Sequence, residues 1–189
     1  MVEALVVLIV GGILLATFTG FYLSQQRTFR RQQVEVETSQ SLRVAVDQIV
    51  RDLRVAGRNP TAAILTPAIG LTSADTAEVH FTIDANSDGV ITTTDPNESK
   101  GFRRSGTTIE TYLADSVAQW QTLSEWLNST GTIFRYFRAD GTEVTALPAS
   151  TADLAAIRRI DVTLTATRTN SGLTIRRTES GSVRLRNLS

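Results

Sequence analysis

The chain has 189 residues, of which 41% are hydrophobic and 20% charged, so it can bury the core of one ordinary domain and is not expected to be disordered. Lysine plus arginine and aspartate plus glutamate number 19 each, which excludes a global charge that would select nucleic acid or another charged partner. The absence of cysteine excludes disulfides, thiolate metal sites and cysteine nucleophiles, and the single histidine, His80, excludes a multi-histidine metal centre.

An apolar segment opens the chain. Residues 4–23 (ALVVLIVGGILLATFTGFYL) carry no charge over about twenty residues, the length that a helix needs to cross a bilayer. A secretory signal peptide would place basic residues before a shorter apolar core, whereas Arg27, Arg30 and Arg31 follow this one. A buried core helix of this length would normally keep one polar face. We therefore predict a membrane helix over residues 1–25.

Glu3 is the acidic residue at the start of this segment. A carboxylate costs about 3 kcal/mol at the centre of a membrane helix and less near the interface. Glu3 therefore either lies at the headgroup level without a role or meets a cationic partner inside an assembly, and the spacing does not distinguish the two. Gly11, Gly12 and Gly20 each weaken the helix by about 1 kcal/mol relative to alanine, which predicts either bending and local melting or close approach of a neighbouring helix.

The helix is predicted to continue over residues 26–59 until Gly57 and Pro60 end it. Residues 24–40 are polar on all sides, as in a solvent-spanning stretch or a helix–helix contact. From residue 41 onward an apolar stripe recurs at three- and four-residue steps, and it consists of Leu42, Ala45, Val46, Ile49, Val50, Leu53 and Ala56. Only this last third of a helix of more than fifty residues, about 80 Å long at 1.5 Å per residue, is expected to pack on a soluble head.

Residues 60–189 are predicted to form that head. β-Branched runs separated by turn signals indicate an antiparallel sheet, so the fold class is α+β with a long N-terminal helix packed on the sheet. The predicted strands span residues 78–83, 107–113, 132–138, 142–145, 157–168 and 173–188, the last broken near Gly181. Asn170-Ser171-Gly172 predicts a hairpin turn between the last two strands. Short helices are predicted at 116–127 and 150–156, the second capped by Ser150 or Thr151.

The clearest chemical motif is DANSDGVITTTD, which begins at Asp84. Oxygen ligands recur at loop positions 1, 3, 5, 9 and 12, glycine occupies position 6, and position 7 offers a backbone carbonyl, which is a calcium-binding pattern. The pattern resembles the loops of EF-hand-like and dockerin proteins. The predicted structural calcium loop spans residues 84–98. Its predicted ligands are Asp84, Asn86, Asp88, the Val90 carbonyl, Thr92 and Asp95, with Glu98 as a further contributor.

Two features of the loop qualify this prediction. Aspartate in place of glutamate at the last position, Asp95, reaches less far and predicts weak binding. The alternative is an acidic hairpin turn without metal, because aspartate, asparagine and glycine are ordinary turn residues.

The remaining candidate residues indicate no catalytic site. The sequence contains no nucleophile elbow, phosphate-binding glycine loop or nucleotide fingerprint, so an enzyme is not expected. His80 alternates with apolar neighbours as a surface or hydrogen-bonded strand residue. Trp120 and Trp126 are expected in core or subunit packing, with binding of a sugar or polymer as the alternative. The pairs 103–104 and 176–177 are arginines that could form a DNA-binding patch, but in a neutral chain they are expected to be solvated, so nucleic acid is not an expected partner.

The opening MVEALVVLIVGGILL resembles the methylated N-terminus of type IV pilins and type II secretion pseudopilins. The segments IVRDLRVAGRNP (49–60), LAAIRRIDVTLTATR (154–168) and SVRLRN (182–187) are similar to minor pilins of the W type and pseudopilins of the J type. Aligning the family's glutamate with Glu3 implies that two residues and a basic leader precede this sequence. Many family members carry a proline near the end of the membrane part, where this chain has glycines.

The resemblance implies a filament subunit whose N-terminal helices form the fibre core, with Glu3 neutralising a neighbour's terminal amine. It implies other pilin-like subunits, prepilin peptidase and the assembly machinery as partners. The subunit would await assembly in the inner membrane with its head outside the cytoplasm, whereas Arg27, Arg30 and Arg31 alone would place that side inside. A pseudopilin at the tip of a type II secretion fibre is one alternative. A membrane-tethered calcium-binding or adhesion module that does not polymerise is another.

Overall fold

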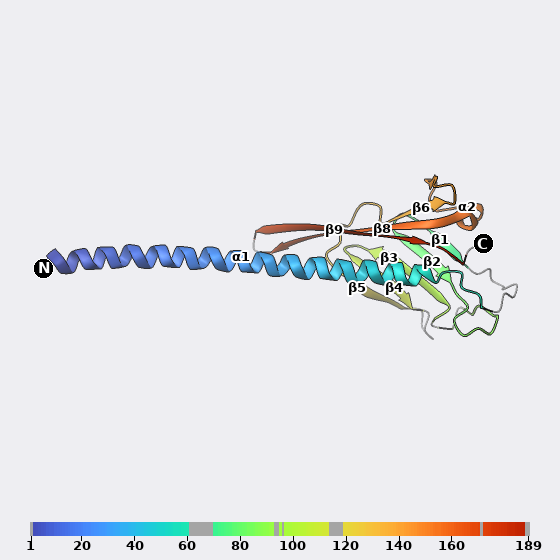
Figure 1. Ribbon diagram of the computed structural model, residues 1–189, viewed down its shortest axis with the longest axis horizontal. Coiled ribbons are helices and arrows are strands. Elements are labelled where there is room, and N and C mark those ends of the chain that lie inside the picture. The colour runs from blue at the N-terminus through green and yellow to red at the C-terminus, as the bar shows by residue number, and fades with distance from the viewer. Residues whose placement is uncertain are drawn as a thin grey trace.

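A computed structural model describes residues 2–60, 70–92, 95, 97–113, 119–170 and 172–187. One long helix, α1, projects from a head of β-strands that surrounds its C-terminal part (Figure 1). The helix has 53 residues, which confirms the prediction of a single helix of more than fifty. In chain order the elements are α1 (Val2–Arg54), β1 (Leu71–Ala74), β2 (Glu78–Thr82), β3 (Ser99–Ser105), β4 (Thr108–Leu113), β5 (Gln119–Ser124), β6 (Phe134–Arg138), β7 (Glu143–Val144), α2 (Thr151–Ala156), β8 (Ile157–Asn170) and β9 (Leu173–Arg184).

The head contains two antiparallel sheets, which confirms the α+β class. One sheet has the strand order β1-β2-β3-β4-β5 and the other β7-β6-β8-β9. Strands β1 and β3 were not predicted, because β1 is short and β3 (SKGFRRS) has one large apolar residue, Phe102. Gly101 in β3 pairs with His80, and a Cβ at this glycine would lie 2.7 Å from the ring nitrogen Nδ1 of His80. The glycine that weakens the strand signal is therefore required by packing.

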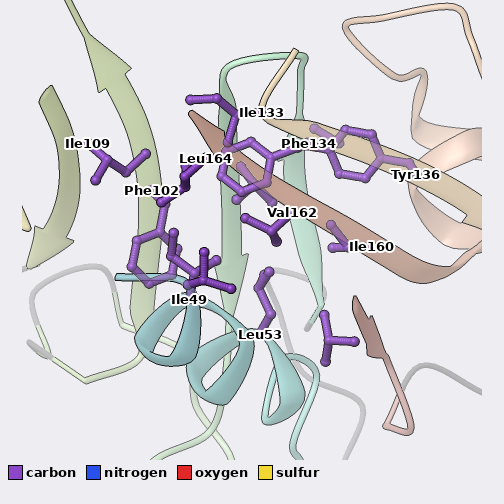
Figure 2. Packing of buried hydrophobic residues seen from close by; sticks show 14 of the residues in the cluster. Ile49, Leu53, Phe102, Ile109, Ile133, Phe134, Tyr136, Ile160, Val162 and Leu164 are labelled. Carbon is purple, nitrogen blue, oxygen red and sulfur yellow. The ribbon is translucent and has the colours of Figure 1, made fainter. Parts of the chain in front are cut away.

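The apolar stripe of α1 forms the centre of the core, as predicted. Leu42, Ala45, Ile49, Leu53 and Ala56 are fully buried, Val46 is 5% exposed, and Val50 packs at the edge. Figure 2 shows Ile49 and Leu53 pointing toward side chains of both sheets, including Phe102 of β3 and Val162 and Leu164 of β8. Full burial of one such aliphatic side chain contributes about 1.5–3 kcal/mol, so this stripe holds the head to the helix.

The head covers more of α1 than the sequence predicted. Strands β8 and β9 form a long ribbon that runs beside α1 toward the N-terminus, beyond the other strands (Figure 1). Val34 and Thr38, four residues apart and hence on one helix face, are buried at 8% and 1% exposure. The prediction that residues 24–40 are polar on all sides and that only the last third of α1 packs was therefore wrong. Helical periodicity did not show this contact because, of the two buried residues on this face, Val34 is apolar and Thr38 is polar.

Polar contacts join the ribbon to α1 beside these two residues. The guanidinium Nη1 of Arg168 on β8 lies 3.0 Å from Oε2 of Glu37, and Arg177 on β9 pairs with Glu35. The hydroxyl of Ser39 donates to Oε1 of Glu179 on β9 at 3.3 Å. These polar residues, which suggested a solvated stretch, therefore attach the ribbon to the helix.

Strand β9 is continuous through Gly181, which corrects the predicted break. Gly181 pairs with Val162 in an unbroken register from Arg184 to Leu173. A Cβ at position 181 would lie 2.8 Å from methyl carbons of both Val46 and Val50. Gly181 therefore marks the place where α1 approaches the strand most closely, and it does not interrupt the strand.

The predicted helix at 116–127 is wrong over the described residues, which begin at 119. Residues 119–124 form edge strand β5. Its register with β4 shifts: Ile109 pairs with Ser124 while Glu110 pairs with Thr122, so Leu123 is the extra residue of a bulge. A bulge breaks the two-residue alternation that identifies a strand. The apolar residues then fall at spacings that also fit a helix.

The other local predictions near the C-terminus are confirmed. Helix α2 is capped by Ser150, whose Oγ accepts the N–H of Asp153 at 3.2 Å. Asn170 pairs with Leu173 across the predicted hairpin, and Gly172 adopts φ 78° there. The remaining predicted strands appear as β2, β4, β6, β7 and β8 with bounds shifted by a few residues.

Candidate assembly helix and metal loop

The apolar side chains described between residues 2 and 23 of α1 are covered by no other part of the described chain. Leu8 and Phe18 are 78% and 76% exposed, and the apolar window of the helix is 0% buried. By length and composition this helix can cross a membrane. The Oγ1 atom of Thr17 lies 3.0 Å from the carbonyl oxygen of Ile13, and that of Thr19 lies 2.8 Å from the carbonyl oxygen of Leu15. The hydroxyl groups thus find partners within their own helix, as an apolar environment requires.

The residues predicted to act in assembly all lie on this exposed half. Glu3 is exposed in the first turn of α1. The helix is continuous through Gly11, Gly12 and Gly20, and a Cβ at any of the three would meet nothing within 4 Å. Packing within the chain therefore does not require these glycines. The two interpretations of these glycines, bending of the helix and close approach of another helix, both apply to the helix within an assembly and not to its packing on the chain's own head.

The predicted metal loop connects β2 to β3, so strands and not helices flank it, as expected. Asp84 is fully buried directly after β2. Its Oδ1 accepts the N–H of Ser87 at 2.7 Å and its Oδ2 accepts the N–H of Gly89 at 3.3 Å. Ser87 and Gly89 adopt φ values of 65° and 79°, which fold the loop around this carboxylate. Ile91, at the anchoring position 8, is 4% exposed.

Three carboxylates meet in this loop. The residues that provide them differ in part from the predicted ligands. Oxygens of Asp84, Asp88 and Glu98 lie within 4.8 Å of one another. Glu98 is fully buried, although the sequence motif included it only as a further contributor. The pairing of the flanking strands places it there, because the N–H of Ile83 donates to the Glu98 carbonyl at 2.9 Å. The sequence did not indicate this position, because the strand that follows Glu98 and pairs with β2 was itself not predicted.

The other predicted ligands do not belong to the cluster of three carboxylates, and most of them make hydrogen bonds within the loop. Asn86 Oδ1 accepts the N–H of Asp88 at 2.9 Å, and Val90 is exposed with its N–H donated to Asp88 Oδ1 at 2.7 Å. The N–H of Thr92 donates to Oε2 of Glu98 at 2.8 Å. Asp95 lies outside the cluster of three carboxylates, and its Oδ1 accepts the N–H of Asn97 at 3.0 Å.

The single histidine and the two tryptophans lie outside the buried core. His80 Nε2 lies 3.0 Å from Glu78 Oε1, so it is a hydrogen-bonded strand residue as predicted. Its ring makes edge contacts with Tyr112 and Trp120, with centroids 5.5 and 5.3 Å apart. Trp126 is 39% exposed with the guanidinium of Arg168 4.1 Å from its ring centroid. Of the two expected environments, the core of the single chain is therefore excluded for Trp126, and packing against another subunit stays a prediction for both tryptophans.

The two arginine pairs lie in different sheets. Arg103 on β3 donates to Oε2 of Glu110 at 2.8 Å and stacks 4.0 Å from the ring centroid of Trp120. Arg104 donates to the Gly131 carbonyl at 2.6 Å. Residues 176 and 177 belong to β9 of the other sheet. One arginine of each pair is also neutralised by a carboxylate, Arg103 by Glu110 and Arg177 by Glu35.

Comparison with known protein families identifies the chain's relatives. Residues 31–185 match the family described as PpdB, prepilin peptidase-dependent protein B, over the second part of α1 and nearly all of the head. The chain belongs to this family. The PpdB family is related to the type IV pilins, which confirms the resemblance inferred from the sequence, and its description names dependence on a peptidase and no enzymatic activity of its own. No curated protein matches the chain.

Membership of the PpdB family and the exposed apolar helix together define the general class of protein to which the chain belongs. The match begins at residue 31, so it does not include the apolar segment, and the two observations are independent. Together they show a pilin-like chain whose N-terminal helix is compatible with a membrane anchor.

Proposed function

We propose that the chain is a structural subunit, a pilin or minor pilin, of a type IV pilus-like filament. The observation that carries this proposal is the division of α1: the head covers one face from Val34 onward, while residues 2–23 remain exposed. An exposed apolar surface of this size needs lipid or other apolar helices around it. Lipid surrounds it before assembly, and the helices of neighbouring subunits surround it in the filament.

In this proposal Glu3 neutralises the terminal amine of a neighbouring subunit, and prepilin peptidase processes the chain. The glycines at 11, 12 and 20 allow neighbouring helices to approach, since a Cβ at each would meet no described atom of the head within 4 Å. The head faces the side of the membrane opposite the cytoplasm until the subunit joins the fibre. Membership of the PpdB family supports this role over that of a tether that never polymerises.

The test compares Glu3→Ala with Asp47→Ala, which removes an exposed carboxylate from the same helix outside the apolar segment. We expect both variants to reach the membrane fraction of the native host at wild-type levels. Glu3→Ala should be lost from the filaments sheared off the cells, whereas Asp47→Ala should be retained, as measured by immunoblot of both fractions. Wild-type incorporation of Glu3→Ala would overturn the role of Glu3 in assembly, and absence of the wild-type chain from every filament preparation would favour the non-polymerising tether.

A further inference from the structure

The carboxylates of the β2–β3 loop lie at a spacing that fits one metal ion. Oxygens of Asp84, Asp88 and Glu98 are within 4.8 Å of one another. Calcium binds oxygen at about 2.3–2.6 Å, so two ligands on opposite sides of one ion are about 4.6–5.2 Å apart. Three negative charges at this distance repel one another unless a cation lies between them. The spacing alone does not identify a site, because acidic clusters also occur without metal.

The buried carboxylate of Glu98 supplies an independent observation. Glu98 is 0% exposed, and its Oε2 accepts the N–H of Thr92 at 2.8 Å with the Thr92 hydroxyl 3.3 Å away. Its Oε1 is buried and has no hydrogen-bond partner among the described residues. Asp84, equally buried, has a backbone N–H on each oxygen. A buried carboxylate oxygen without a donor is costly, and a cation is the partner that this oxygen lacks.

We propose that this loop binds calcium and that Glu98, three residues beyond the motif's last position, provides the closing carboxylate in place of Asp95. The chain turns back at this point, because the N–H of Asp95 donates to the Thr92 carbonyl at 3.3 Å and that of Glu98 to the Asp95 carbonyl at 3.2 Å. Within this turn Asp95 lies outside the cluster of three carboxylates, with its Oδ2 3.5 Å from the Nδ2 of Asn86, whereas Glu98 belongs to the cluster. The longer glutamate side chain then performs the role that a final glutamate has in an EF-hand loop.

The chemistry of the available donors favours calcium over other metals. The cluster offers carboxylates, and Asn86 Oδ1 and the Val90 carbonyl are further oxygen donors from the motif. The motif contains no cysteine or histidine, the ligands that zinc prefers. Magnesium requires a tighter octahedral arrangement and retains its water ligands, so a wide loop of protein oxygens suits calcium better.

The ion would connect three parts of the head. The N–H of Asp84 donates to the Arg58 carbonyl at 2.9 Å, and the N–H of Gly57 donates to the Thr82 carbonyl at 3.0 Å. The loop is thus hydrogen-bonded to the residues that follow α1. Bound calcium would fix the start of β3 to the end of β2 and both to the end of the helix. This role is structural and does not depend on the proposed filament function.

The experiment uses the full chain in detergent micelles, freed of metal with a chelator and then titrated with calcium chloride or magnesium chloride. Calcium at about a hundred times Kd is expected to raise Tm by roughly 5–10 °C, and magnesium at the same concentration to raise it much less. Titration calorimetry gives Kd directly. Absence of any calcium-dependent change in Tm and of any binding heat would overturn the proposal.

Two matched variants identify the closing ligand. Glu98→Gln is expected to weaken calcium binding about tenfold or more, because it removes one of few ligand charges, whereas Asp95→Asn should change Kd by less than about threefold. Without metal, Glu98→Gln should melt at or above the wild-type temperature, because the buried repulsion is removed. The reverse order of the two affinities would overturn the assignment to Glu98. If Glu98→Gln does not fold, Asp95→Asn decides: retained affinity supports Glu98 and lost affinity refutes it.

Discussion

Residues 2–23 and residues 34–53 belong to one continuous helix, but only the second stretch is covered by its own chain. The second stretch has a narrow apolar stripe, and the two sheets bury that stripe except at its edge, where Val50 is partly buried. The first stretch is apolar on all sides, so a sheet on one face would leave the remaining faces in water. The head can therefore stabilise only an amphipathic helix. The first stretch needs an apolar environment on all sides. Changes in the two stretches should therefore have different consequences.

The largest effect is expected from Leu53→Ala compared with Leu14→Ala. Leu53 is fully buried, so its truncation leaves a cavity in the head and should lower the free energy of unfolding by about 2–5 kcal/mol. Leu14 is 62% exposed and should leave the unfolding of the head unchanged. Chemical denaturation of both variants in the same detergent measures the difference. Equal losses in the two variants would show that the exposed stretch also stabilises the head.

A smaller effect is expected from Gly181→Ala. The added methyl group would meet Val46 and Val50 at 2.8 Å, so the helix or the strand must shift, at a cost of about 1–3 kcal/mol. Ser180→Ala, at the exposed neighbouring position, should stay within about 0.5 kcal/mol of wild type. Thermal unfolding followed by circular dichroism compares the two. A neutral Gly181→Ala would mean that helix and strand are farther apart than in the structure.

The smallest effect is expected from Glu37→Gln, at the end of the covered stretch. The hydrogen bond from Arg168, followed by that from Gln33, lowers the pKa of Glu37 below 4.5. A lowered pKa in the folded state stabilises the protein above pH 4.5, and this contribution disappears as the pH falls through the folded value.

Wild type should therefore melt slightly higher than Glu37→Gln at pH 7, and the difference should vanish in acid. Asp47→Asn, which changes an exposed carboxylate on the same helix, should show no difference at either pH. A difference between wild type and Glu37→Gln that persists in acid would exclude the ion pair as its cause.

The sequence predicted the features that depend on neighbours along the chain. The length of α1, its stripe, the cap at Ser150 and the hairpin at Gly172 all follow from short-range patterns. The burial of Val34 could not be predicted, because it depends on how far β8 and β9 extend beside the helix. The bulge at Leu123 hid a strand for a similar reason, since only pairing with β4 reveals the extra residue.

The same distinction between short-range and long-range features applies to the metal loop. Asp84 and Asp88, two of the ligands predicted from the motif spacing, belong to the carboxylate cluster. The involvement of Glu98 in the cluster depends on pairing across β2 and β3, because Ile83 and Glu98 meet only when the strands align. A linear motif assigns the last ligand by counting positions along one loop. Strand pairing in a hairpin can instead bring a residue from beyond the motif into the cluster.

Residues 24–33 are exposed on every side between the last apolar residue of the first stretch and the first covered residue, Val34. Ten helical residues span about 15 Å, which exceeds the thickness of about 5–8 Å of one headgroup layer. If residues 2–23 lie in the hydrocarbon, as the proposed function requires, this stretch acts as a rigid spacer that holds the β-sheets clear of the lipid surface. In the proposed filament, neighbouring subunits would then bring their membrane helices together while their heads stay clear of the bilayer.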